Sequence, residues 1–174
     1  MSPMTSALIS YWHRLPAVSP VVRRKTLDAI RERVRAGFET RSALVPFALG
    51  DVDDGLVVTA TQAYVAASPG PADADALNEA TEWVRRGLAL NRGAVFGALL
   101  ALEDGRIVER LAALRLVLSA AEVETTCRVL GPQPHPQALA FLRDWADLVA
   151  DGPLETEAAA LRATVEGEAR ARAA

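Results

Sequence analysis

A-L-V-P-F-A-L-G-D-V-D-D-G-L-V-V-T-A-T-Q-A-Y-V occupies residues 43–65 and consists of two apolar stretches separated by an acidic turn. The first apolar stretch begins two residues before the quoted segment and spans residues 41–49. It is apolar at nearly every position, which is typical of a short helix buried on several sides. Asp53 and Asp54 supply side-chain oxygens that cap a second helix. One face of that helix carries Leu56, Ala60, Ala63 and Ala67. The stretch therefore predicts two helices joined by a tight turn.

The composition extends this prediction to the whole chain. Its 174 residues are 51% hydrophobic and 24% charged, which fits a single globular domain over residues 1–174 and excludes a disordered, collagen-like or disulfide-scaffold protein. Alanine and leucine dominate the apolar residues, and alternation of period two is absent. We therefore predict an all-α fold.

Further helices follow from local start and stop signals. Ser19 and Pro20 begin one that Gly37 ends, and Ser119 with Glu122 has the spacing of a capping box. Asp75 is predicted to cap a helix that exits at residues 91–93. The remaining predicted helices span residues 94–102, the Ile107 to Leu118 stripe, the Leu139 to Val149 stripe and the Leu154 to Val165 stripe. Residues 68–75 are a candidate hinge, and the tail at 167–174 is expected to fray.

An irregular repeat is visible in the sequence. D-D-G-L-V-V from Asp53 aligns with E-D-G-R-I-V from Glu103, and each follows a short apolar helix. The helix that begins at Ser19 fits the same frame, preceded by a candidate helix over residues 5–15. Antiparallel helix pairs stacked side by side explain this pattern.

Residues 43–65 resemble a repeat unit of the HEAT-like family of helical repeats, with Pro46 in the first helix and paired valines opening the second. The resemblance implies a short superhelix of stacked helix pairs that binds another protein; an irregular multi-helix bundle is the alternative. Arg23 matches the arginine that bonds an aspartate ladder in the turns of such repeats. Val58 and Glu109 stand at the equivalent positions of the later copies.

Charge is unevenly distributed along the chain. Residues 1–46 hold 8 basic and 3 acidic residues, whereas residues 47–82 hold 7 acidic and no basic ones, although the net charge is only −3. Arg24, Arg31 and Arg35 fall on one side of a helix, because separations of 7 and 11 residues return to nearly the same angle at about 100° per residue. This row is either a site for an acidic partner or an ordinary solvated face interrupted by Asp28 and Glu32.

Large aromatic side chains are candidates for anchoring a partner, because buried aromatics dominate interface hot spots. Tyr11 and Trp12 are adjacent, and Trp83 and Trp145 stand separately. Packing into the core is the commoner role of such side chains. We include Tyr11 and Trp12 with the arginine row as predicted partner-binding residues.

Signals for catalysis are weak, so no catalytic residue, metal or cofactor is predicted. His13 and His135 lack metal-ligand neighbours at helical spacing. Cys127 is interpreted as a small apolar residue packed in a helix. The acids of residues 51–55 are interpreted as helix caps rather than a calcium loop, because Gln62 stands where the bidentate glutamate would be.

Export and membrane insertion are not expected, since the sequence shows no secretory leader and no long apolar span. The lone Cys127 suits a reducing compartment, and we expect a cytoplasmic location. Nucleic acid is disfavoured as a partner, because the chain is acidic overall.

Three functions remain open. The first is a non-catalytic module or scaffold that binds another protein, one with an acidic surface, through exposed helix faces. The second is a HEAT-like enzyme acting on nucleic acid, such as a base-excision glycosylase, for which Asp144 and Trp145 are the weak signal. The third is a subunit that self-associates through its terminal repeats, residues 1–15 and 154–174, since unstacked end repeats need polar caps or partners.

Overall fold

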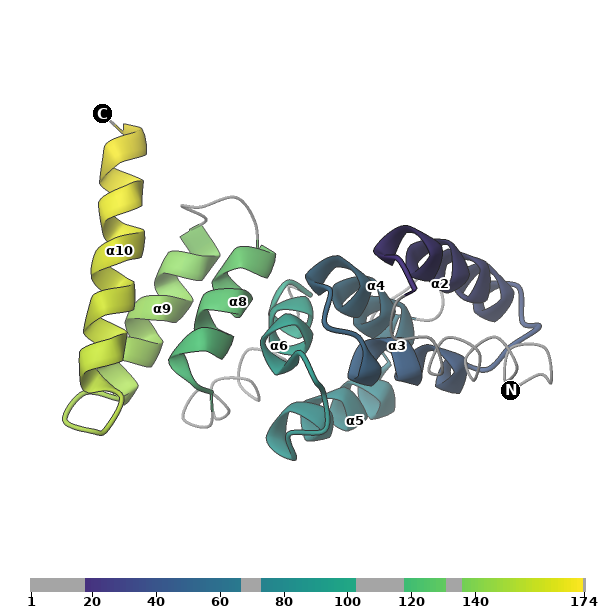
Figure 1. Cartoon of the computed structure of the whole chain (residues 1–174). Coiled ribbons are helices and arrows are strands. Elements are labelled where there is room, and N and C mark those ends of the chain that lie inside the picture. The colour runs from purple at the N-terminus through teal and green to yellow at the C-terminus, as the bar shows by residue number, and fades with distance from the viewer. Residues whose placement is uncertain (1–17, 67–72, 103–117, 131–135, 174) are drawn as a thin grey trace. The chain divides into compact units, whose positions relative to one another are not determined.

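A computed structural model describes residues 18–66, 73–102, 118–130 and 136–173 (Figure 1). Every regular element in these ranges is a helix, which confirms the all-α prediction. The chain divides into two compact units, Met1–Asn91 and Arg92–Ala174. This boundary lies beyond the hinge predicted at residues 68–75, and that hinge stays a prediction. No helix in the described ranges has the length and apolar character needed to cross a bilayer.

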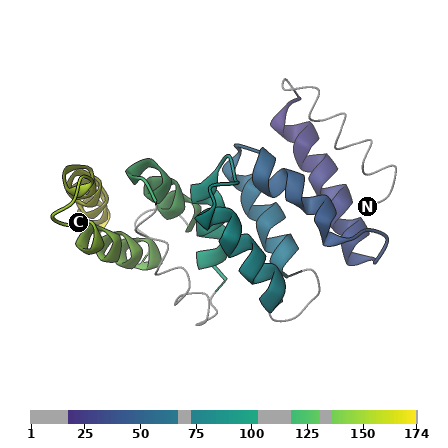
Figure 2. The ribbon, with the colours of Figure 1, turned by 90° about the horizontal axis from the view of Figure 1, so that it is seen from below.

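The first unit is organised around helix α4 (Asp54–Val65). It packs against α2 (Pro20–Arg35), the short 3₁₀ turn η1 (Arg41–Leu44), α3 (Val45–Gly50) and α5 (Ala74–Arg85). Figure 2 shows α4 beside α3, with α2 and α5 as neighbours. The core is made of Leu27, Ile30, Leu44, Phe47, Leu56, Val57, Trp83 and Val84. Burial of these apolar side chains holds the five elements together.

Helix α2 begins and ends as its sequence predicts. Ser19 Oγ accepts a hydrogen bond from Val22 N at 3.3 Å, and Pro20 occupies the first turn, where its missing N–H costs nothing. Gly37 ends the helix with a φ of 80°, a left-handed conformation that favours glycine. Phe38 N then bonds to Arg33 O at 2.9 Å and Gly37 N to Val34 O at 3.1 Å, the two bonds of a Schellman motif.

The helix predicted over residues 41–49 is divided in the structure into η1 and α3. Pro46 is the physical reason, because it has no N–H to donate into a continuous helix and is tolerated only in a first turn. The structure places it in the first turn of α3, after the tighter 3₁₀ turn.

The boundaries predicted for the helix from Asp75 to residues 91–93 were wrong at both ends. Asp73 is the cap, since its Oδ1 accepts from Asp75 N at 2.9 Å and from Ala76 N at 3.1 Å. The helix ends at Arg85, because Gly87 adopts a φ of 67° and starts a second Schellman motif. Leu88 therefore lies outside the helix and is exposed instead of continuing its apolar face.

The second unit contains α6 (Arg92–Leu100), α8 (Ala120–Leu130), α9 (Pro136–Leu148) and α10 (Glu155–Ala173). All residues of α6 after Arg92 are buried, as predicted for this apolar stretch, but the helix begins and ends two residues before the predicted range 94–102. It packs closely on α8, while α9 packs on both α8 and α10 (Figure 1). Phe96 and Phe141 meet with ring centroids 5.3 Å apart, which links α6 to α9.

The predicted capping box opens α8. Glu122 N donates to Ser119 Oγ at 3.2 Å, and Ser119 N donates to Glu122 Oε1 at 3.0 Å. Pro136 starts α9. Helix α10 continues through Ala173, so residues 167–173, which were expected to fray, form its last turns. The predicted helix over residues 5–15 lies outside the described residues, as does the predicted helix over residues 107–118 except Leu118.

Candidate interaction surface

Among the described residues, helix α2 packs against the rest of the first unit along one side. Leu27 and Ile30 bury this side in the core. Arg23 joins it to the turn between α3 and α4, where its Nε lies 2.9 Å from Asp51 Oδ2.

The carboxylate of Asp51 also organises the turn. Its Oδ1 accepts from Val52 N at 2.8 Å and from Asp53 N at 2.9 Å, and its side chain is only 1% exposed. Arg23 donates in addition to Val18 O at 2.7 Å. A buried carboxylate is tolerated only when charged and polar partners replace water in this way. These contacts therefore join the start of α2 to the turn between α3 and α4.

The predicted arginine row lies beside the buried side of α2, about 90° around the helix from Leu27 and Ile30. Arg24 Nη1 also donates to Gly55 O at 3.3 Å, in the first turn of α4. Arg24, Arg31 and Arg35 are all exposed, in agreement with their expected common face. Arg24 and Arg31 flank Asp28, with shortest N–O distances of 3.6 Å and 3.3 Å, and Arg35 lies 3.9 Å from Glu32. Helix α2 contains six basic and two acidic residues, so these pairs leave a net positive helix.

Exposed apolar side chains mark both ends of α2. Val21 in its first turn is 65% exposed, and Phe38, just past its end, is 73% exposed. In a Schellman motif the residue at the position of Phe38 often packs back onto the helix, but here most of its surface faces solvent. The surface formed by Val21, the arginine row and Phe38 is the α2 face.

The predicted aromatic residues do not join the α2 face. Tyr11 and Trp12 lie outside the described residues. Trp83 is 4% exposed and Trp145 is fully buried, so both belong to the core, the commoner of the two roles weighed for them. Asp144 is exposed on α9. Buried in this way, the indole of Trp145 offers no open face on which a nucleic-acid base could stack.

An acidic face that sequence patterns did not reveal lies on α5. Asp75, Glu79 and Glu82 lie on one side of this helix, since separations of 4 and 7 residues keep them within about 60° of one another. Arg86 follows on the same side, 3.6 Å from Glu82. The strongly acidic stretch of residues 47–82 was the available signal, but the helix boundaries were needed to align these side chains.

Behind this face, a mixed polar and aromatic cluster joins η1, α4 and α5. Tyr64 Oη donates a hydrogen bond to Glu79, and the Tyr64 ring lies 4.7 Å from the ring of Trp83. The guanidinium carbon of Arg41 lies 5.9 Å from the centroid of the Tyr64 ring. Arg41 Nη2 also pairs with Asp73 Oδ2 at 3.2 Å. Burial, followed by the hydrogen bond to Glu79, raises the pKa of Tyr64 to about 12.

Folding stability is expected to fall between pH 10 and pH 12 because of Tyr64. The unfolded tyrosine, with a pKa of 10.0, loses its proton first, whereas the folded one keeps it until about 12. The stabilisation is complete below pH 10 and disappears through the folded pKa, a loss on the order of 2 to 3 kcal/mol. Urea unfolding of a Tyr11→Phe variant across this range measures it, since Tyr64 is then the remaining tyrosine.

The matched control adds Tyr64→Phe to that variant. It should show a smaller loss of stability over the same pH range, because it has no phenol to titrate. Equal losses in the two proteins would contradict the assignment to Tyr64.

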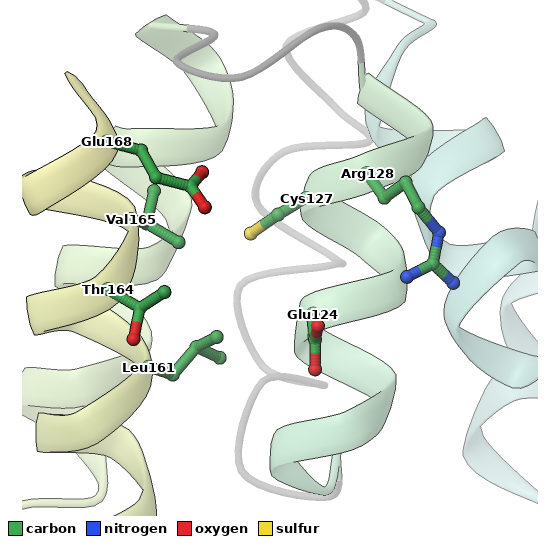
Figure 3. A pocket seen from close by; sticks show the side chains of 7 residues that line it. All are labelled: Glu124, Cys127, Arg128, Leu161, Thr164, Val165 and Glu168. Atoms are coloured by element: carbon green, nitrogen blue, oxygen red, sulfur yellow. The ribbon is translucent and has the colours of Figure 1, made fainter. Parts of the chain in front are cut away.

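The second unit contains a small hollow between α8 and α10 (Figure 3). Its volume is about 180 Å³, and it is lined by Glu124, Cys127, Arg128, Leu161, Thr164, Val165 and Glu168. Cys127 points from α8 toward α10. Burial, with a smaller contribution from Glu124, raises the pKa of this thiol to about 11. The thiol therefore stays protonated near neutral pH, as expected of a packing residue rather than a nucleophile.

In the part of the chain that the structure describes, the acidic, histidine and cysteine side chains form no group that could hold a metal ion. Across the described residues, no three His, Cys, Asp or Glu side chains come together as a metal site would require. Asp53 caps α4 as the sequence predicts, because its Oδ1 accepts from Leu56 N at 3.0 Å. Asp51 does not cap the helix and pairs with Arg23 instead. His13 and His135 lie outside the described residues.

Comparison with known proteins gives no relative to place beside this surface. No family model, no curated protein and no solved structure matches the chain.

Proposed function

We propose that this chain is a non-catalytic module that binds an acidic protein through the α2 face. The observation that carries the proposal is the exposed row of Arg24, Arg31 and Arg35 on a helix that Leu27 and Ile30 fix in the core. A rigid helix loses little freedom on binding, which favours affinity. Complementary charge steers the encounter with an acidic surface.

We also propose that the helices form a short HEAT-like stack, because such stacks present one side of their helices to partners. The contact between Arg23 and Asp51 supports this proposal, since it joins a helix to a turn 28 residues away in the sequence. A cytoplasmic location is part of the same proposal, since Cys127, the only cysteine in the sequence, suits a reducing compartment.

Affinity capture from native lysate tests the proposed function. The immobilised chain should recover an acidic protein in stoichiometric amount, and the Arg24→Glu, Arg31→Glu, Arg35→Glu variant should recover at least tenfold less, because like charges then face each other across the contact. A matched control, Arg170→Glu with Arg172→Glu, reverses exposed arginines on α10. It should capture as much as the wild type.

Circular dichroism of each variant shows whether the fold is kept. Recovery of no acidic protein by the wild type contradicts the proposal. Undiminished capture by the folded triple variant contradicts the assignment of the α2 face.

A further inference from the structure

Two exposed helix faces of the first unit carry matching charge patterns. On α2, Asp28, Arg31 and Arg35 follow at separations of 3 and 4 residues and give the order negative, positive, positive. On α5 and its C-cap, Glu79, Glu82 and Arg86 also follow at separations of 3 and 4 residues and give the order negative, negative, positive. The two charge patterns become complementary when one of them is followed backwards.

Antiparallel apposition places each charge opposite its counterpart. Asp28 then faces Arg86, Arg31 faces Glu82, and Arg35 faces Glu79. The rise of about 1.5 Å per residue keeps the three pairs within roughly 2 Å of register over two turns. A parallel arrangement would instead oppose Asp28 and Glu79, which is unfavourable between like charges.

From this complementarity we infer that the acidic partner of the α2 face is a second copy of this chain, which presents its α5 face. The inference rests on the proposed function, because it names the partner of the same surface. Each copy carries both faces, and α4 packs against both α2 and α5 (Figure 2). The contact is heterologous, since different surfaces of the two copies meet.

Exposed apolar residues add to one end of this contact. Val21 opens α2 on the same side as Asp28 and is 65% exposed. Leu88 and Leu90 follow α5 and are 51% and 70% exposed. The antiparallel arrangement brings the start of α2 to the end of α5, so these side chains can cover one another and exclude water.

The ion pairs that already exist within each helix do not prevent the contact. Asp28, Arg31, Glu82 and Arg86 have side chains 42–65% exposed, and surface pairs of this kind contribute only a few tenths of a kcal/mol. Asp28 already lies beside Arg24 and Arg31, and Glu82 beside Arg85 and Arg86, so each carboxylate gains a third cationic neighbour in the contact. The two oxygens of a carboxylate offer about four lone-pair sites, which leaves room for it. The pairs can therefore be shared between copies.

Paired charge swaps in the full-length chain test the inference. One variant is Asp28→Arg with Arg31→Glu, and the other is Glu82→Arg with Arg86→Glu. Each swap keeps the net charge of the chain and still places an acidic residue beside a basic one within its helix. It reverses the sign of two of the three charges that the helix presents to the other copy. Sedimentation velocity at micromolar concentrations measures association, at about 0.02 M and about 0.5 M salt, because screening weakens contacts between exposed charges.

The wild type should associate at low salt and less at high salt. Each swap alone should lower the association constant at least tenfold, and the two swaps in one chain should restore it. If a swapped chain loses its helical circular dichroism, Arg31→Gln and Glu82→Gln provide neutral replacements, each expected to lower the constant at least threefold.

Three results would overturn the inference: a wild type that stays monomeric, single swaps that leave the association constant unchanged, or a combined variant whose association constant does not return toward that of the wild type. Its failure is distinguishable from that of the proposed function. A monomeric chain that still captures another acidic protein through the arginine row refutes only the self-association. A monomeric chain that captures no protein refutes both.

Discussion

Replacing Gly93 with alanine is expected to lower the free energy of unfolding of the second unit by about 2 to 3 kcal/mol. A Cβ at this position would lie 2.5 Å from Glu122 O and 2.9 Å from Thr125 Cβ, so the new methyl group meets the backbone of α8. A backbone oxygen cannot rotate away, and α6 and α8 must separate. Urea unfolding followed by circular dichroism measures the loss.

The same helix pair is close at Gly97, one turn further along α6. A Cβ there would lie 2.8 Å from Val129 Cγ1, so Gly97→Ala is also destabilising. Because part of this clash is with a side chain, Val129→Ala should recover part of the loss in a double-mutant cycle. The glycine spacing of four residues lets α6 and α8 pack closely, and Thr126 Oγ1 lies 3.1 Å from Gly93 O across that contact.

Gly167 in α10 provides the control, because nothing lies within 4 Å of the position that a Cβ would occupy there. Gly167→Ala should be neutral or stabilising by about 0.5 to 1 kcal/mol, the ordinary advantage of alanine inside a helix. Equal effects of Gly93→Ala and Gly167→Ala would contradict close packing of α6 on α8.

Replacing Asp51 with alanine is expected to lower the stability of the first unit by about 3 kcal/mol or more, because it leaves Arg23 without its carboxylate partner. The side chain of Arg23 is 14% exposed, so water compensates only part of the loss. The N–H groups of Val52 and Asp53 also lose their acceptor. Urea unfolding again gives the difference.

Two further variants separate the causes. Asp51→Asn keeps an oxygen for the turn but removes the charge, so it should fall between wild type and alanine. Asp28→Ala breaks exposed ion pairs on the same helix and should cost less than about 0.5 kcal/mol. A loss for Asp51→Ala no larger than that for Asp28→Ala would show that the buried pair contributes little.

The local signals were the most dependable part of the sequence. Ser19, Gly37 and the pair Ser119 and Glu122 were predicted correctly, because a helix cap depends on residues within a few positions of one another. Where two local signals competed, the prediction was wrong. The predicted cap of α5 was Asp75 and its predicted end residues 91–93, whereas the structure has the cap at Asp73 and the end at Arg85, before Gly87.

The candidate site was only partly predictable. The arginine row follows from helical periodicity alone, and the structure places it on an exposed face. The α5 face was missed, since its alignment depends on where that helix begins and ends. Trp83 and Trp145 could not be assigned to core or surface, because an aromatic side chain suits either environment.

The sequence by itself determined the helical class, most helix starts and the charge polarity, because propensity, caps and formal charge belong to residues or their close neighbours. Only the tertiary structure decided which glycines lie against another helix and which carboxylate is buried. Gly93 meets Glu122, and Arg23 meets Asp51 across 28 residues. Such contacts depend on the packing of whole helices, so the spacing of residues along one helix does not contain them.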